Sequence, residues 1–205
     1  MTARILPGAM IHIWDHLVIT LRDGERQTAF LSWYSIRWSA SLGAGNVALF
    51  EVPAGPAGPI AMTLTDDLGL GQRQQERLRA MGNDFAALSG TPVLASFASL
   101  PFRDASFGVR IEAPAMTIEA SWDDVSEPFW VSGEGGTFSP LEEIWAAFVG
   151  APSASITVDG TAIPGAPFDD DVWQPKLGRS LSSAHAAFRA SSMTTSSGVA
   201  PFCGP

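Results

Sequence analysis

The sequence is poor in cysteine, tyrosine and charged residues. Its 205 residues include one cysteine, Cys203, and one tyrosine, Tyr34. A single cysteine excludes an internal disulfide framework and a cysteine-rich zinc site. Charged residues make up only 16% of the chain, against about 25% in an ordinary soluble domain, and the net charge is −9. This acidic balance argues against nucleic acid or an anionic membrane surface as the main partner.

Long hydrophobic runs are missing as well. No stretch approaches the ~18 uninterrupted apolar residues of a transmembrane helix. Residues 1–9 carry one arginine and have no apolar run before Pro7, which makes a poor secretory signal. We therefore expect a cytoplasmic protein with a flexible leader over residues 1–9, a single β-rich domain over 10–190, and a flexible tail over 191–205.

Apolar and polar residues alternate through much of the chain, which predicts strands. The first strand begins at Ile11, and the dipeptide Asp23-Gly24 after it is a strong hairpin signal before an aromatic return strand over 28–38. Further strands are predicted over 46–52, 60–64, 93–100, 107–111, 116–122, 129–131, 156–158 and 161–163. Helices are predicted over 72–81 by propensity, with a cap at Asp66 or Asp67, and over 139–150 and 180–188 by capping residues and apolar stripes.

These elements predict a mainly β fold. About nine strands, joined mainly by hairpins, with two or three short helices suit a single antiparallel β-barrel or sandwich. The plan resembles lipocalin-like barrels in architecture alone, because their N-terminal Gly-x-Trp signature is absent. The residues two places before Trp14, Trp33 and Trp38 are not glycine but His12, Leu31 and Ile36.

The first hairpin predicts the most specific candidate site. If Asp23-Gly24 is a two-residue loop, Leu17 faces Phe30, Asp15 faces Ser32 and Ile13 faces Tyr34. Asp15 and Tyr34 would then share an apolar lumen. Burial there disfavours the charged carboxylate, which raises its pKa and makes it a usable acid or base. The alternative is that Asp15 is solvated at a barrel rim, or turned outward by a bulge.

We accordingly expect a cofactor-independent acid–base enzyme of the isomerase, cyclase or hydratase type, acting on a small apolar molecule in the barrel cavity. Asp15 and Tyr34 are the expected catalytic residues, and the expected ligand-binding residues are Ser32, Trp33, Trp38 and Trp130. One alternative is a non-catalytic binding or carrier protein for such a ligand. A second is a structural or interaction protein whose core is filled.

Other patterns are less specific. His12 and His16 are separated by about 13 Å on a strand, too far to share one metal ion, so no metal site is expected. Ser182 and His185 lack the nucleophile elbow of a hydrolase. The carboxylates near Trp122 and Trp130 could serve glycoside chemistry, but a solvated acidic turn is the simpler interpretation. Asp169–Asp171 lacks a calcium-loop pattern, and the segment 69–73 lacks a phosphate-binding fingerprint.

Overall fold

Strands dominate the computed structural model, which describes residues 10–55, 58–103, 105–133 and 142–193. An eight-stranded sheet, sheet A, contains in spatial order β5 (Val93–Leu94), β4 (Gly58–Thr65), β3 (Gly45–Gly55), β2 (Arg26–Ser39), β1 (Met10–Asp23), β15 (Ala184–Met193), β10 (Glu142–Gly150) and β9 (Phe129–Gly133). A five-stranded sheet, sheet B, contains β12 (Thr161–Ala162), β11 (Ser153–Val158), β8 (Met116–Asp123), β7 (Ser106–Ala113) and β6 (Ser96–Arg103). The remaining elements are β13 (Asp169–Asp170), β14 (Leu181–Ser182), α1 (Leu68–Ala80), η1 (Ala86–Leu88), η2 (Asp171–Trp173) and α2 (Gln174–Leu177).

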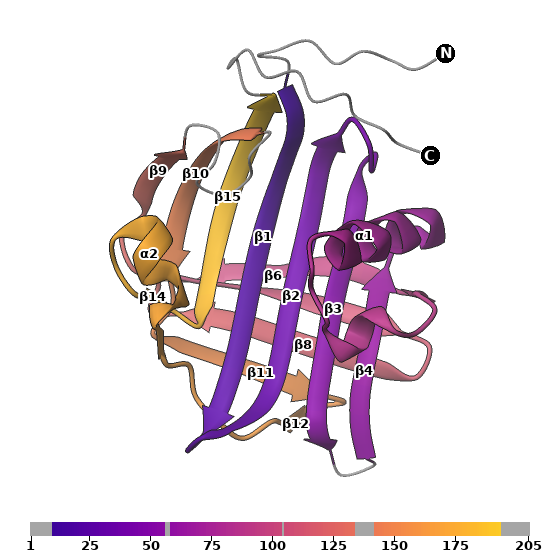
Figure 1. The fold of residues 1–205 in the computed structure, drawn as a ribbon. Coiled ribbons are helices and arrows are strands. Elements are labelled where there is room, and N and C mark those ends of the chain that lie inside the picture. Colours follow the sequence, from indigo (N-terminus) through magenta and orange to yellow (C-terminus); the bar gives the residue numbers. More distant parts are fainter. Residues whose placement is uncertain (1–9, 56–57, 104, 134–141, 194–205) are drawn as a thin grey trace.

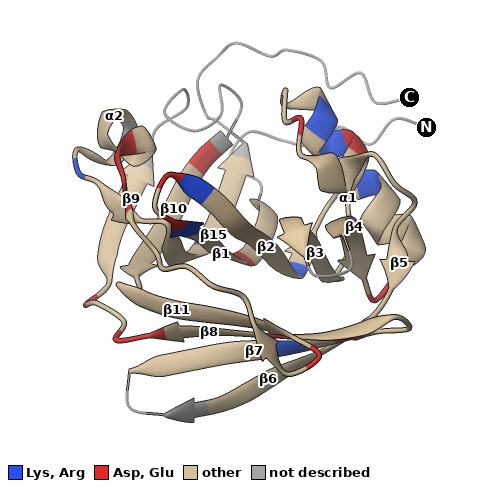
Figure 2. Cartoon of the chain, turned by 90° about the horizontal axis from the view of Figure 1, so that it is seen from below, with Lys and Arg blue, Asp and Glu red and all other residues tan. Residues whose placement is uncertain are grey.

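The elements form three layers. Sheet B covers one side of sheet A with its strands crossing those of sheet A, and α1 and α2 lie on the other side (Figures 1 and 2). Sheet A ends at β5 and β9, and sheet B ends at β12 and β6, so neither closes into a barrel. The mainly β class is confirmed, whereas the barrel is not found. Sheet A is mixed, because β5 runs parallel to β4.

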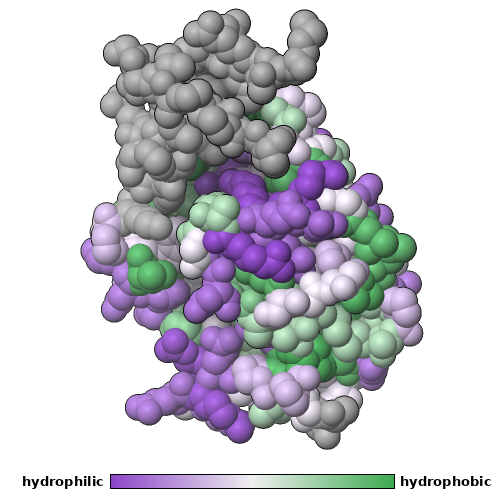
Figure 3. Space-filling view, turned by 45° about the vertical axis from the view of Figure 1, so that its right-hand side comes forward, coloured by the Kyte–Doolittle hydropathy of each residue, from purple (hydrophilic) through white to green (hydrophobic). Residues whose placement is uncertain are grey.

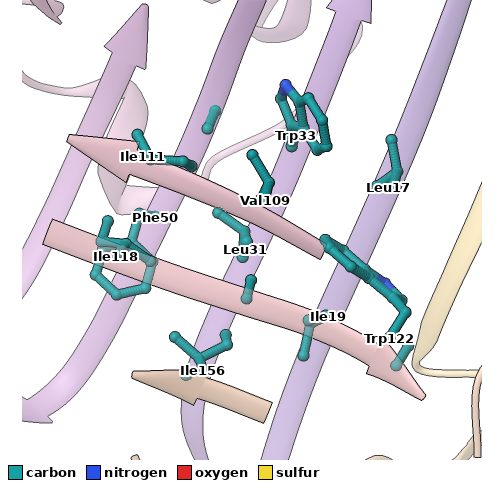
Figure 4. Packing of buried hydrophobic residues seen from close by; sticks show 14 of the residues in the cluster. Leu17, Ile19, Leu31, Trp33, Phe50, Val109, Ile111, Ile118, Trp122 and Ile156 are labelled. Atoms are coloured by element: carbon teal, nitrogen blue, oxygen red, sulfur yellow. The ribbon is translucent and has the colours of Figure 1, made fainter. Parts of the chain in front are cut away.

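The space between the two sheets is filled by hydrocarbon side chains. Ile19, Leu31 and Phe50 from sheet A are fully buried against Val109 and Ile118 from sheet B (Figure 4). Removing such side chains from water is the main stabilising contribution to a fold of this kind. The predicted lumen of polar and apolar groups is therefore not found between the sheets.

The first hairpin forms, but its predicted register is wrong. The two loop residues are Gly24 and Glu25, and Asp23 pairs with Arg26. Gly24 has a φ of +63°, the positive value that a tight hairpin loop favours at glycine. This shift moves the pairing by two residues, which leaves each side chain on its predicted side of the sheet.

A β-bulge in β2 then exchanges the predicted sides of the sheet for the residues beyond it. The pairing slips by one more residue between Arg22 and Leu21, so Thr28 is the extra residue on β2. Beyond the bulge Leu17 faces Trp33 instead of Phe30, and Asp15 faces Ser35 instead of Ser32. A second irregularity places Ile13 opposite Trp38 instead of Tyr34. Because side chains alternate along a strand, the one-residue slip puts Asp15 on the opposite side of sheet A from Tyr34.

Two of the three predicted helices are strands. The helix predicted over 72–81 is confirmed as α1, capped by the Asp67 carboxylate, which accepts a hydrogen bond from the Leu70 N–H at 2.7 Å. Within the segment 139–150, residues from Glu142 onward form β10, and residues 139–141 lie outside the described part. The segment 180–188 contributes to β14 and β15. Both β10 and β15 pair with strands on either side, and this pairing outweighs the local helical pattern.

Both predicted terminal segments fall mainly outside the described residues. The leader over 1–9 and residues 194–205 are not described. β15 runs to Met193, so Ser191 and Ser192, predicted to begin the tail, are strand residues.

Candidate functional site

The predicted site residues lie on both sides of sheet A. Asp15, Trp38 and Trp130 lie on the side that faces sheet B, because the cross-strand partners from β2 to β9 place them there. Trp33 lies on that side too. Its ring stacks on Phe97 at 6.3 Å, which makes it a core residue. The structure therefore brings four of the six predicted residues to one side, but in different environments.

Asp15 lies beyond the filled core and forms an ion pair. Its Oδ2 atom lies 2.9 Å from the Arg37 Nη2 atom. The Arg37 side chain is two-thirds exposed and the Asp15 side chain is 18% exposed, so the pair joins a largely covered carboxylate to a guanidinium at the surface. Trp38 and Trp130 are 43% and 78% exposed. The catalytic role of Asp15 stays a prediction, and no contact with Tyr34 supports it.

Ser32 and Tyr34 lie on the other side of sheet A, which we call the helix side. On that side a groove lies at the Thr20–Arg22 end of β1, with η1 and the loop before it on one flank and Phe168 and Asp170 on the other. Its volume is about 390 Å³, within the range of small-molecule sites. The lining residues are Thr20, Arg22, Gln27, Phe30, Glu51, Asp84, Phe85, Ala86, Phe168 and Asp170.

Aromatic rings form the walls of the groove. Phe30, from β2, stacks on Phe85, which precedes η1, at 4.8 Å between ring centroids. On the opposite flank the Arg22 guanidinium lies 3.8 Å over the Phe168 ring, a cation–π contact that orders both side chains. The groove thus has an aromatic pair on one side of Thr20 and a guanidinium-covered ring on the other.

Carboxylates provide most of the charge in the groove. Glu51, Asp84 and Asp170 line it, against Arg22 as the single cation among its lining residues. Glu51 accepts a hydrogen bond from the Ala87 N–H at 2.8 Å, which fixes its position. The exposed surface of α1, which covers the other end of the helix side, is hydrophilic (Figure 3).

A cluster of polar rings continues the β1 floor beyond the groove. His16 lies on the same side of β1 as Thr20, and it is partly exposed. Its ring stacks on Tyr34 at 4.2 Å, and its Nε2 atom lies 2.9 Å from the Ser32 hydroxyl oxygen. Burial, with the positive charges of Arg189 and Arg77, lowers the pKa of His16 well below its usual range. Burial also raises the pKa of Tyr34. Both groups are therefore neutral at neutral pH.

His185, on β15, lies between this cluster and the groove. It pairs across the sheet with Val18, which lies between His16 and Thr20 on β1. Its Nδ1–H donates to the Ser182 carbonyl oxygen at 2.8 Å, which leaves Nε2 as the acceptor atom. Burial lowers its pKa to about 4, although this hydrogen bond and the Asp170 carboxylate favour the protonated form.

The far end of the same floor is aromatic and cationic. The His12 ring stacks on Trp14 at 4.8 Å. The guanidinium groups of Arg77, from α1, and Arg189, from β15, lie 4.5 Å and 5.6 Å from the centre of the Trp14 ring. Burial and these two cations lower the pKa of His12 to about 4.

The less specific patterns do not assemble into sites. The Ser182 hydroxyl donates to the Ala151 carbonyl oxygen at 2.6 Å, and only the Ser182 backbone contacts His185. Asp170 and Asp171 act locally, capping η2 and accepting a hydrogen bond from Ser180. Within the described ranges, no group of three or more His, Cys, Asp or Glu residues could hold a metal ion.

Sequence reasoning missed His185 as a neighbour of His16 because it placed His185 on a helix. His185, Ala187 and Arg189 fall on one side of a strand and Ala184, Ala186 and Phe188 on the other, and this two-residue spacing of the polar residues was the available signal. Nothing in the local sequence shows that Phe85 and Phe168 line the same groove, since they belong to distant loops.

The comparisons with known proteins place this chain in no family. No protein-family model matches the sequence, and no curated protein matches it. Among solved structures, the chain is similar to an acetoacetate decarboxylase from Legionella pneumophila, with 10% sequence identity and a TM-score of 0.41. The alignment covers 99% of this chain and 93% of that chain. In the described part of the chain, no helix has the length and apolar character needed to span a membrane.

Proposed function

We propose that the groove along β1 binds a small organic molecule. The observation that carries the proposal is the groove itself, a hollow of about 390 Å³ over Thr20 that is lined by aromatic rings and by carboxylates. Small-molecule sites combine apolar surface with converging polar groups, and this groove combines aromatic rings with a lining in which polar surface predominates. The space between the sheets is filled by side chains, and this groove on the outer side of sheet A is larger than the hollow on the outer side of sheet B.

The lining favours a ligand with a flat apolar body and a cationic end. The body would lie against the Phe30 and Phe85 rings. Three carboxylates against one guanidinium favour a positively charged group over a negatively charged one. An ammonium group can also be attracted to the faces of the aromatic walls. The ligand class is thus an aromatic or alicyclic amine.

Ligand binding is better supported at this groove than acid–base catalysis. A general base is most effective when its pKa lies near the working pH. His185, with a pKa lowered to about 4, accepts a proton poorly at neutral pH. Neutral imidazoles serve instead as hydrogen-bond partners. Asp15 lies on the opposite side of sheet A from Tyr34, so the two side chains cannot act on the same ligand at this groove.

The test compares two probes on the full chain by backbone amide NMR. Phenethylamine is expected to shift the resonances of Thr20, Phe85 and Asp170, and phenylpropionate to bind at least about tenfold more weakly. Thr20→Trp places a bulky ring on the groove floor, so this variant should lose both responses. Ser121→Trp is the matched control, because it places the same ring in a hollow on the outer side of sheet B.

Two results would contradict the proposal. One is that neither probe shifts the groove resonances. The other is that Thr20→Trp and Ser121→Trp bind phenethylamine equally well, which would place the probe elsewhere.

A further inference from the structure

Two arginines from different elements converge on one tryptophan on the helix side of sheet A. The guanidinium carbons of Arg77, from α1, and Arg189, from β15, lie 4.5 Å and 5.6 Å from the centre of the Trp14 ring, so the two groups are within about 10 Å of each other. α1 carries three arginines and one glutamate, so its side of this region is basic (Figure 2). We call Trp14, His16, Arg77 and Arg189 the cationic cluster.

The electrostatic environment changes sign along the floor of β1. Within the described part of the chain, no carboxylate raises the pKa of His12 or His16, the two imidazoles beside these arginines, and both cations lower it. At His185, by contrast, the Asp170 carboxylate raises the pKa. The floor is therefore positive around Trp14, whereas three carboxylates make the groove at the other end negative.

The convergence of two like charges favours an anion between them. Guanidinium groups at this separation repel each other, and the repulsion is stronger where protein replaces water. The negatively polarised face of the Trp14 ring offsets part of this repulsion. An oxyanion that contacts both groups would offset the rest, because it attracts each of them directly.

The geometry suits a carboxylate or phosphate group. One such group can accept hydrogen bonds of about 2.8 Å from both guanidinium groups at this separation. Arg77 and Arg189 also make other contacts in the molecule. Each guanidinium nevertheless has five N–H donors in a planar fork, which is more than one partner uses, and this fork matches the shape of an oxyanion.

The cationic cluster borders solvent and an apolar residue. Arg77, Arg189 and His16 are half-buried, so the cluster is neither sealed in the core nor fully solvated. Val18 follows His16 on the same side of β1 and is half-buried as well. A molecule whose oxyanion contacts the arginines can therefore place a small apolar body against Val18.

We infer that Arg77 and Arg189 bind the carboxylate or phosphate group of a small organic molecule over Trp14. This site is distinct from the groove at Thr20, because four residues of strand, about 13 Å, separate His16 from Thr20. The net charge of −9 does not prevent binding. Salt screens the distant acidic groups over about 8 Å, whereas the two guanidinium groups contact the anion directly.

The first experiment titrates the full chain with phenyl phosphate and with benzoate and follows backbone amide and indole NMR resonances. The Trp14, His16 and Arg189 resonances should shift, with half-saturation below about 1 mM for at least one anion. The tighter of the two anions identifies the preferred oxyanion. Benzyl alcohol, which has the same ring without a charge, should bind at least about tenfold more weakly. Raising NaCl from about 20 mM to about 300 mM should weaken anion binding.

The second experiment changes the arginines. Arg77→Gln and Arg189→Gln should each weaken binding of the anion by about tenfold or more, because each removes charge-assisted hydrogen bonds. Arg110→Gln is the matched control, since it makes the same change in net charge on the outer side of sheet B, where Arg110 pairs with Glu112 and Glu119. This control should leave the affinity within about twofold.

Thermal unfolding of each variant verifies its fold. If a glutamine variant does not fold, Arg77→Lys or Arg189→Lys takes its place; it keeps the charge but removes the planar fork, and should weaken binding by about threefold or more. Three results would overturn the inference: no shift at Trp14 and His16 in the unchanged protein, equal binding of benzyl alcohol and the anions, or an affinity that changes no more in the Arg77 and Arg189 variants than in Arg110→Gln. Shifts confined to Thr20 and Phe85 would place the anion in the groove and overturn it as well.

Discussion

All three histidines of the chain lie on the helix side of sheet A, and each is held neutral. Burial is the main cause of the lowered pKa at His12, His16 and His185, and the Arg77 and Arg189 cations add to it at the first two. Two effects raise the free energy of the protonated form of a buried imidazole close to a guanidinium: desolvation and like-charge repulsion. The polar cluster therefore keeps one protonation state through the neutral range.

This arrangement predicts that the protein is less stable in mild acid. The pKa of His12 and of His185 is about 4 in the folded protein and near 6.5 in the unfolded chain. The unfolded state therefore binds protons first, so stability is complete above pH 6.5 and falls as the pH drops toward 4. Between pH 7.5 and pH 5 we expect a loss of about 2 kcal/mol for each of these two histidines.

Urea unfolding at the two pH values measures this loss. His185→Asn keeps a side-chain N–H for the Ser182 carbonyl and removes the titrating group, so its stability should depend less on pH than that of the unchanged protein. Equal pH dependence of the two proteins would show that His185 does not contribute.

Placement of single residues was the part of the site that the sequence predicted least well. Asp15, Ser32 and Tyr34 were correctly placed on the paired strands of one hairpin. The side of sheet A on which each of them lies depended on one extra residue in β2, Thr28. The Thr28 hydroxyl donates to the Leu21 carbonyl oxygen at 3.3 Å. A bulge of one residue has no reliable local signal, yet it reverses the side of each residue up to the second irregularity at Ile13 and Trp14.

At the scale of elements, the sequence predicted secondary structure correctly where local residues decide it, and incorrectly where pairing with distant strands decides it. α1 was predicted correctly because its residues favour a helix and Asp67 caps it. The hairpin of β7 and β8 was also predicted, and Arg110 lies opposite Glu119 with 3.7 Å between their charged atoms. β10 and β15 were predicted as helices, because their alanines and spaced apolar residues suit a helix and only pairing within sheet A decides otherwise.

The cap of α1 gives a prediction at this scale. Asp67→Ala removes the acceptor of the Leu70 N–H and should cost about 1 kcal/mol in the free energy of unfolding. Asp67→Asn keeps a capping oxygen and should cost only a few tenths. Denaturant unfolding of the two variants measures the difference. Equal losses would mean that the negative charge, and not the hydrogen bond, stabilises the helix start.

At the scale of the whole molecule, the two sheets are joined by packing and by a buried hydrogen bond. The Trp122 ring, on β8, is fully buried and stacks on Phe107 at 5.3 Å. Its Nε1–H donates to the Val18 carbonyl oxygen of β1 at 2.8 Å, so one side chain connects the sheets through both its apolar surface and its polar atom.

Trp122→Phe tests this connection. The smaller ring leaves a void and an unpaired carbonyl group, and we expect a loss of about 2–3 kcal/mol in the free energy of unfolding. Guanidinium unfolding measures it, and an unchanged denaturant dependence would show that the same surface is still exposed on unfolding. A loss below about 0.5 kcal/mol would mean that the sheets do not depend on this residue.

The position of β15 has a consequence for how the chain is made. β15 inserts between β1 and β10, so β1 lacks one of its two neighbours until the chain has been synthesised as far as Met193. Until then, the backbone N–H and C=O groups on the β15 side of β1 have no strand to pair with. Assembly is therefore a late event with long loops to close, which slows folding and leaves the nascent chain dependent on protection from aggregation.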